Sequence, residues 1–280
     1  MSIWQKQGQL LAGDIMGAYD TVSQLYPHVP PLLLWRAWEY AAYQRFALSE
    51  PVLDIGCGDG HYFRLVWPNV QHVVGIDMDE GVAVAARQSG VYQTVYATPA
   101  DQSQIPSGIF GSAFANCALE HMDRLDNVLS EICRSVRPGG TFLLSVVTDK
   151  LIEWSALPQI ASLLGAPERA QTLQDDYTGY HHLVNPLSAD GWAEHLQLAG
   201  FDVLEYIPIV PELSGRLFLF LDQFWHVKRA QGEVGDTLHP YLAGLPQFPR
   251  AFKQIIAGFL DLERDWSVGC GAVFLAQRRI

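Results

Sequence analysis

The chain has 280 residues, 49% of them hydrophobic and 17% charged, which excludes global disorder and allows one large domain or one domain with an insertion. Its formal net charge is −12, and an acidic surface repels phosphate backbones, so we expect no nucleic-acid substrate. The 4 cysteines lack C-x-x-C spacing, no signal-peptide pattern is found, and no apolar run reaches the ~20 residues of a membrane span; we therefore expect a soluble, cytoplasmic protein.

The first 48 residues precede any strand pattern and are expected to form a helical segment. A proline-rich breaker at residues 26–31 separates two predicted helices, and the second of these, over residues 32–48, is rich in Trp and Tyr.

From residue 51 the chain alternates between short apolar runs and helical patterns. The predicted strands cover residues 51–55, 72–77, 91–97, 110–118, 141–147, 201–208 and 271–277, and the clearest helices cover residues 60–67, 80–88, 125–136 and 188–199. Such alternation predicts an α/β fold with a doubly wound parallel sheet and helices on both faces. Residues 209–268 are dense in aromatic side chains and are expected to form a helical insertion before the last strand.

A glycine-rich loop follows the first predicted strand, in the sequence V-L-D-I-G-C-G-D-G of residues 52–60. Gly56, Gly58 and Gly60 are spaced to form a tight loop in which a ligand lies against bare backbone. His61 stands where a dinucleotide fingerprint would place its last glycine, and no nucleoside-triphosphate motif is present. Asp54, just before the loop, favours a ligand that carries an ammonium group.

Polar residues also follow the other early strands, where the ligand of an open α/β sheet is expected to bind. Asp77 can accept both ribose hydroxyls of a nucleoside, and Met78 can cover one face of its adenine. Asp101, beside Gln102, can accept from the adenine amino group, and Asn116 ends the fourth predicted strand.

This ordered set of motifs resembles the class I S-adenosylmethionine-dependent methyltransferases, most closely their type 11 small-molecule branch. The resemblance covers about residues 50–148 and rests on the glycines, Asp77, Asp101, the segment Leu119-Glu120-His121 and the turn Arg137-Pro138-Gly139-Gly140. It implies a seven-stranded, mostly parallel sheet with an antiparallel last strand. It also implies a helical lid at residues 1–48, a Rossmann-like core at 49–208 plus 269–280, and a substrate cap at 209–268.

The resemblance further implies the cofactor, S-adenosyl-L-methionine, and the transfer of its methyl group to a small, apolar or aromatic acceptor by in-line displacement. The residues expected to bind the cofactor are Tyr19 (as a lid tyrosine), Asp54, Gly56, Cys57, Gly58, Gly60, Asp77, Met78, Asp101, Gln102, Asn116 and His121. Two alternatives stay open: a non-catalytic protein that binds the cofactor, and an enzyme of the same fold that uses it for non-methyl chemistry.

On the acceptor side, His181 and His182 lie in a loop after the fifth predicted strand. If the acceptor must lose a proton, one of the two is the candidate general base; the alternative is a structural role for both. No Cys/His cluster has zinc spacing, so no metal is expected. The tetrapeptide [DNS]-P-P-[FYW] of enzymes that methylate the amino groups of DNA bases is absent.

Overall fold

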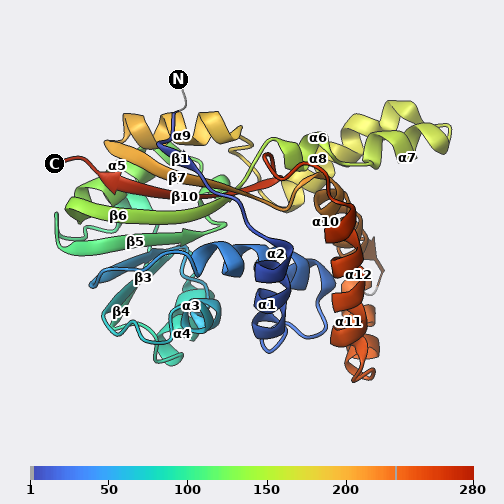
Figure 1. Cartoon of the computed structure of the whole chain (residues 1–280), viewed down its shortest axis with the longest axis horizontal. Coiled ribbons are helices and arrows are strands. Elements are labelled where there is room, and N and C mark those ends of the chain that lie inside the picture. The colour runs from blue at the N-terminus through green and yellow to red at the C-terminus, as the bar shows by residue number, and fades with distance from the viewer. Residues whose placement is uncertain (1–2, 231) are drawn as a thin grey trace.

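One sheet of 8 strands runs through the computed structural model, which describes residues 3–230 and 232–280 (Figure 1). The strand order is β1-β7-β10-β6-β5-β2-β3-β4, and β10 is antiparallel to both of its neighbours. The strands are β1 (Lys6–Gln7), β2 (Val52–Ile55), β3 (Val73–Asp77), β4 (Thr94–Ala97), β5 (Phe110–Asn116), β6 (Val136–Val147), β7 (Phe201–Ile209) and β10 (Gly271–Arg278). A separate hairpin pairs β8 (Lys228–Arg229) with β9 (Gly232–Glu233).

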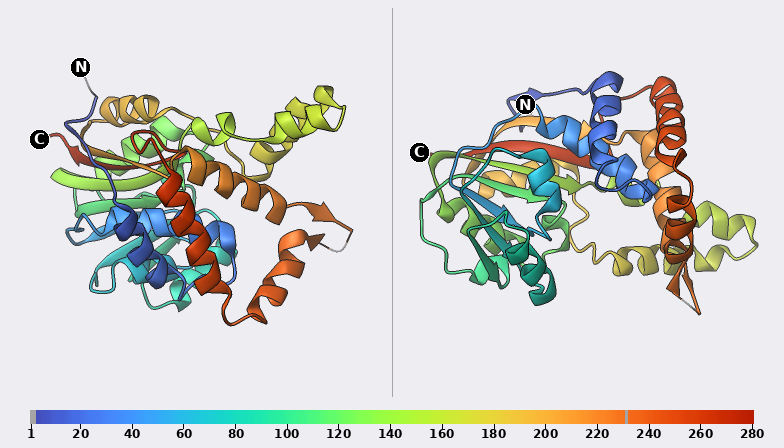
Figure 2. Two further views of the ribbon diagram at one scale, coloured as in Figure 1. Left: turned by 45° about the vertical axis from the view of Figure 1, so that its right-hand side comes forward. Right: turned by 90° about the horizontal axis from the view of Figure 1, so that it is seen from below.

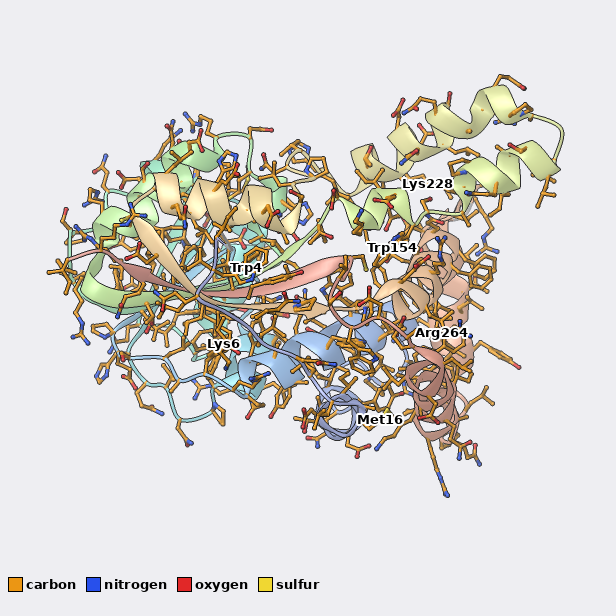
Figure 3. The ribbon with its side chains drawn as sticks, turned by 45° about the horizontal axis from the view of Figure 1, so that its top comes forward. Trp4, Lys6, Met16, Trp154, Lys228 and Arg264 are labelled. Atoms are coloured by element: carbon orange, nitrogen blue, oxygen red, sulfur yellow. The ribbon has the colours of Figure 1, made fainter. Side chains whose placement is uncertain are left out.

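The α/β class and the antiparallel last strand are confirmed, but the predicted count of seven strands is wrong. The additional strand is β1, which forms one edge of the sheet and pairs in parallel with β7. Trp4 packs on Tyr206 and Lys6 forms an ion pair with Glu205, so the N-terminal segment is held across β7 (Figure 3). Two exposed polar residues, Lys and Gln, carry no apolar alternation from which this strand could be predicted.

Helices cover both faces of the sheet, and side chains that alternate along each strand supply a core to each face. On β6, Phe142 and Leu144 belong to the core under α5 and α9, whereas Leu143 belongs to the core on the other face. The first face is covered by α5 (Leu125–Ser135) and α9 (Ala189–Leu198), and the second by α1 (Ala12–Val22), α2 (Pro30–Tyr43), α3 (His61–Val66) and α4 (Glu80–Gln88).

The remaining helices lie beyond one end of the sheet, where the parallel strands reach their carboxyl ends (Figure 2). They are α6 (Lys150–Glu153), α7 (Leu157–Leu163), α8 (Ala170–Tyr180), α10 (Glu212–Trp225), α11 (Val234–Ala243) and α12 (Phe248–Leu262). The α12 helix packs on α1, because the Tyr19 hydroxyl donates to the carbonyl of Pro249 (2.7 Å) and Lys253 pairs with Asp20. The N-terminal segment and the insertion therefore form one continuous layer.

Short 3-10 turns lie at the same edge of the sheet: η1 (Ala100–Gln102) after β4 and η2 (Leu119–His121) after β5, while η3 (Pro167–Arg169) joins α7 to α8. Within residues 3–230 and 232–280, no helix combines the length and the apolar character needed to cross a membrane.

Candidate active site

The glycine loop after β2 is built from three residues with positive φ: Gly56 (66°), Gly58 (57°) and Gly60 (81°). A Cβ on Gly56 would lie 2.5 Å from the Cβ of Ala118, and one on Gly60 would lie 2.6 Å from the ring of Tyr92. A Cβ on Gly58 would meet nothing within 4 Å. Packing thus requires two of the glycines, and the third borders open space.

A cavity of about 420 Å³, here named the glycine-loop cavity, lies beside this loop. Its wall comes from the ends of β2 and β3, from η1, and from the segment after β5. The predicted residues that it brings together are Gly56, Asp77, Met78, Asp101, His121 and His182. The rest of the wall includes the polar residues Thr98, Asp123 and Arg124, which form no motif and were not predicted as site residues.

Asp77 both supports the loop and faces the cavity. Its Oδ2 accepts from the backbone N–H of Gly58 (3.1 Å), and its Oδ1 accepts from that of Asp79 (3.0 Å). A carboxylate has about four acceptor sites, so Asp77 retains capacity for a ligand hydroxyl. Met78 is 76% exposed at the cavity mouth, where a flat apolar group would cover it.

Asp101 lies in the same wall but is already paired with a cation. Its two carboxylate oxygens contact the guanidinium of Arg124 at 2.9 and 3.0 Å. An adenine amino group would therefore share Asp101 with Arg124. The adjacent Gln102 lies outside the cavity.

Asp54 lies behind the wall rather than in it. Its carboxylate accepts from the Tyr92 hydroxyl (2.7 Å), and burial raises its pKa to about 7. Cys57 is also buried, and burial raises the pKa of its thiol well above the ordinary value. The structure therefore gives both side chains a supporting position beneath the loop.

Two further residues that were predicted to bind the cofactor, Asn116 and Tyr19, form hydrogen bonds outside the glycine-loop cavity. The Oδ1 of Asn116 accepts from the Tyr43 hydroxyl (2.8 Å) on α2. Tyr19 is buried, and its hydroxyl is used by Pro249, so the structure gives it a packing position between α1 and α12 instead of a place over the cavity.

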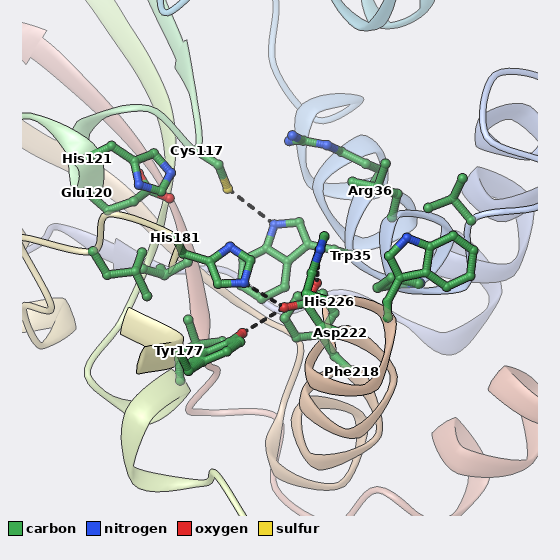
Figure 4. Close-up of a pocket in the computed structure, with 17 residues that line it drawn as sticks. Trp35, Arg36, Cys117, Glu120, His121, Tyr177, His181, Phe218, Asp222 and His226 are labelled. Atoms are coloured by element: carbon green, nitrogen blue, oxygen red, sulfur yellow. Dashed lines mark hydrogen bonds and ion pairs between the residues drawn. The ribbon is translucent and has the colours of Figure 1, made fainter. Parts of the chain in front are cut away.

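A second cavity of about 360 Å³, here named the aromatic cavity, adjoins the first (Figure 4). Cys117 and His121 line both cavities and form their shared wall. Cys117 has a φ of +44°, which is uncommon for a residue other than glycine and turns the chain sharply after β5. The wall of the aromatic cavity is mostly apolar and includes Trp35, Val147, Leu151, Leu183, Phe218 and Trp225.

The structure separates the two candidate histidines. His181 lines the aromatic cavity, where its Nε2 lies 3.0 Å from the Asp222 carboxylate. His182 lines the glycine-loop cavity, and its Nε2 lies 3.4 Å from Asp123. The positive φ of His182 (48°) ends the turn after α8 and directs the two consecutive side chains to different cavities.

Glu120 is a polar group of the aromatic cavity; the sequence places it in the Leu119-Glu120-His121 segment but gives it no role in the site. It is fully buried, and among the described residues neither carboxylate oxygen has a hydrogen-bond partner. Burial raises its pKa from 4.5 to about 7. A neighbouring carboxylate, Glu39, is fully buried as well, but it accepts from Trp35 (2.9 Å) and Ser145 (2.7 Å). Only burial, which no sequence pattern reveals, distinguishes Glu120 from an ordinary turn residue.

Comparison with known proteins gives a consistent result. Residues 53–144 match the model of a family described as a methyltransferase domain. A malonyl-(acyl-carrier protein) O-methyltransferase of Serratia marcescens is 26% identical over 131 residues, which cover 47% of this chain and 49% of that protein. An uncharacterized methyltransferase of Schizosaccharomyces pombe is 28% identical over 196 residues, which cover 64% of this chain and 71% of that protein. The chain thus spans about half the length of the Serratia relative.

Among solved structures, phosphoethanolamine N-methyltransferase 2 of Haemonchus contortus, in complex with S-adenosyl-L-methionine, has the same fold with a TM-score of 0.55. The two chains are 16% identical, and the match covers 95% of this chain and 57% of that one.

Proposed function

Because this chain carries a class I, S-adenosylmethionine-dependent methyltransferase domain at residues 53–144, we propose that it transfers the methyl group of that cofactor to a small molecule in the aromatic cavity. The observation that carries the proposal is the shared wall. Cys117 and His121 border both cavities, so a donor in one and an acceptor in the other would meet beside these two residues.

The residues of the glycine-loop cavity fit S-adenosylmethionine. In our proposal the open side of Gly58 admits the ligand against the backbone, Asp77 accepts its ribose hydroxyls, and Met78 covers its adenine. Asp101 and His121 remain candidate contacts. Asp54, Cys57, Gly60 and Asn116 are proposed to support the wall from behind, Tyr19 is proposed to hold α1 on α12, and Gln102 lies outside the cavity.

The bound cofactor would supply a sulfonium methyl group: the bond from acceptor to carbon forms as the carbon–sulfur bond breaks, and S-adenosylhomocysteine leaves as a neutral thioether. The apolar wall of the aromatic cavity favours an apolar or aromatic acceptor and excludes water from it. If the acceptor is a hydroxyl, its proton would be taken by one of the two candidate bases: His181, which lines the aromatic cavity, or His182, for an acceptor that reaches past the shared wall into the glycine-loop cavity.

Two segments outside the core are proposed to enclose the acceptor. Residues 1–48 contribute Trp35 and Arg36 to the aromatic cavity, and residues 209–268 contribute Phe218, Asp222 and His226. We therefore propose that the first is a lid and the second a substrate cap on a core of residues 49–208 plus 269–280. We also propose a cytoplasmic location, which the 4 free cysteines support. An acceptor other than a nucleic acid is proposed as well, because the net charge of −12 would repel a phosphate backbone.

The proposal is tested by incubating the protein with S-adenosylmethionine and a panel of aromatic and aliphatic alcohols, amines and acids, and measuring S-adenosylhomocysteine and methylated product by mass spectrometry. Leu183→Trp, which fills the aromatic cavity, should keep cofactor affinity and lose turnover. Leu198→Trp, at an exposed position on α9, is the matched control and should keep both. If Leu183→Trp turns over like the parent, the acceptor lies elsewhere. Cofactor binding with no methylated product across the panel would favour the non-catalytic alternative.

A further inference from the structure

Three potential metal ligands meet in the wall of the aromatic cavity (Figure 4). His181 follows α8 directly, whereas Asp222 lies on α10 and His226 one helical turn later, at the end of that helix. One donor atom from each lies within 4.8 Å of the other two. The ligands come from segments about 40 residues apart, so no short sequence motif predicts that they form a cluster.

Of the two measured distances, one matches ligands that share a metal ion and the other is slightly longer, so His226 would move closer when the ion binds. His181 Nε2 lies 3.0 Å from Asp222 Oδ2, and His226 Nε2 lies 3.6 Å from Asp222 Oδ1. Two ligands about 2.1 Å from one metal, at angles between octahedral and tetrahedral, are themselves separated by about 3.0–3.4 Å. His181 Nε2 is buried and, despite its closeness to Asp222, has no partner with hydrogen-bond geometry among the described residues. A hydrogen bond therefore does not account for this approach.

A second layer of contacts orients the ligands. His226 Nδ1 lies 2.7 Å from the Glu233 carboxylate, which directs the other ring nitrogen, Nε2, with its lone pair toward Asp222. The Tyr177 hydroxyl donates to Asp222 Oδ2 (2.9 Å). A carboxylate behind a ligating histidine, and a hydrogen bond to a ligating carboxylate, are the usual outer contacts of protein metal sites.

From this geometry we propose that His181, Asp222 and His226 bind one divalent transition-metal ion of the Zn²⁺ type. Two imidazoles and one carboxylate suit Zn²⁺ and its neighbours, and three protein ligands leave at least one position open. Because all three ligands line the aromatic cavity, that position would face it and would bind an oxygen of the acceptor. The acceptor part of this inference rests on the proposed function, but the metal site does not. If His181 holds no metal, it remains a candidate base.

The test uses the full chain, stripped with a chelator, dialysed against Zn²⁺ and then against metal-free buffer, with bound zinc measured by plasma mass spectrometry. The parent should retain one Zn²⁺ per chain, and Asp222→Asn and His226→Gln should retain none. Glu233→Gln should weaken binding by about 10–100-fold, as expected for the loss of an outer contact. His195→Gln removes a histidine that is also paired with an aspartate but lies on α9, and it should retain the ion.

A variant that gains a spectroscopic signal distinguishes the loss of a metal ligand from misfolding of the variant protein. His226→Cys keeps a ligand, and its Co²⁺ form should show a sulfur-to-metal charge-transfer band that the parent lacks. Absence of stoichiometric Zn²⁺ in the parent, or full retention in both Asp222→Asn and His226→Gln, would overturn the site. Calorimetry with S-adenosylmethionine on the same proteins separates the two proposals. His226→Gln should bind the cofactor like the parent. A parent that holds Zn²⁺ but does not bind S-adenosylmethionine would contradict the proposed function and leave the metal site standing.

Discussion

A side chain at Gly58 would have two separate effects: it would strain the backbone, and it would occupy the volume proposed for the ligand. One pair of variants can distinguish these effects. Gly58 and Gly90 both have positive φ (57° and 69°), and a Cβ on either would meet no protein atom within 4 Å. A valine at each position should cost a similar backbone strain, about 1–2 kcal/mol. We predict that only Gly58→Val abolishes binding of S-adenosylmethionine, because only that side chain would enter ligand volume.

Isothermal titration calorimetry with the cofactor, together with thermal unfolding of both variants, checks this prediction. Cofactor affinity at the parental level in Gly58→Val would remove the glycine loop from the binding site. Equal loss in Gly90→Val would attribute the effect to strain.

Glu120 makes the stability of the ligand-free protein depend on pH. Its pKa rises on folding from 4.5 to about 7, so between these values the folded chain holds a proton that the unfolded chain releases. Stability contributed by the protonated carboxyl is present at low pH and is lost as pH rises through this window. Since one pKa unit corresponds to about 1.4 kcal/mol, the loss above pH 7 approaches roughly 3 kcal/mol.

We predict that Glu120→Gln, which cannot ionise, is more stable than the parent at pH 8 and loses this advantage by pH 5. Chemical denaturation at both pH values measures the difference in unfolding free energy. Glu168→Gln, at an exposed position, is the control and should show no such crossover. A Glu120→Gln variant that is less stable than the parent at both pH values would mean that the carboxylate has a partner in solution.

The helix α2 is bonded to the ligand edge of the sheet through one buried carboxylate. Its buried Glu39 accepts from the Ser145 hydroxyl on β6 (2.7 Å), from Trp35 (2.9 Å) and from the Cys117 thiol (2.9 Å), and it forms an ion pair with Arg36 (2.6 Å). This network attaches a helix of the N-terminal segment to the wall that the two cavities share. The conformation of α2 therefore depends on the same residues that would surround the methyl group.

We predict that α1, α2, α10 and α12 exchange their amide hydrogens more slowly when S-adenosylhomocysteine is added. The physical reason is that α2 contacts the shared wall and α12 is fixed to α1 through Tyr19 and Lys253, so ordering of the wall extends to the whole layer. Hydrogen exchange followed by mass spectrometry measures this, with α9 on the other face as the internal control. Protection confined to residues 50–125 would make the layer structural only.

At the scale of the whole molecule, the features that the sequence predicts are those that depend on short-range patterns, such as the strands and the loops that follow them. Each early strand is a short apolar run with a polar residue at or near its end, and parallel pairing places Asp77 beside the glycine loop as expected. The aromatic cavity could not be predicted, because Trp35, Tyr177 and Phe218 are brought together only by tertiary packing. The burial of individual side chains could not be predicted either, because nothing in the sequence shows that Tyr92 covers Asp54.

The origin of the two cavity walls has a consequence for how this protein could have diversified. Within the described residues, the matched segment 53–144 supplies the whole lining of the glycine-loop cavity except His182. It supplies only Cys117, Glu120 and His121 of the aromatic cavity. Under the proposed function, donor and acceptor recognition would therefore lie on different parts of the chain. Evolution, or an engineer, could exchange side chains on α2 and α10 to change the acceptor without disturbing the donor site, and an acceptor known for a relative that shares only the matched segment does not carry over to this chain.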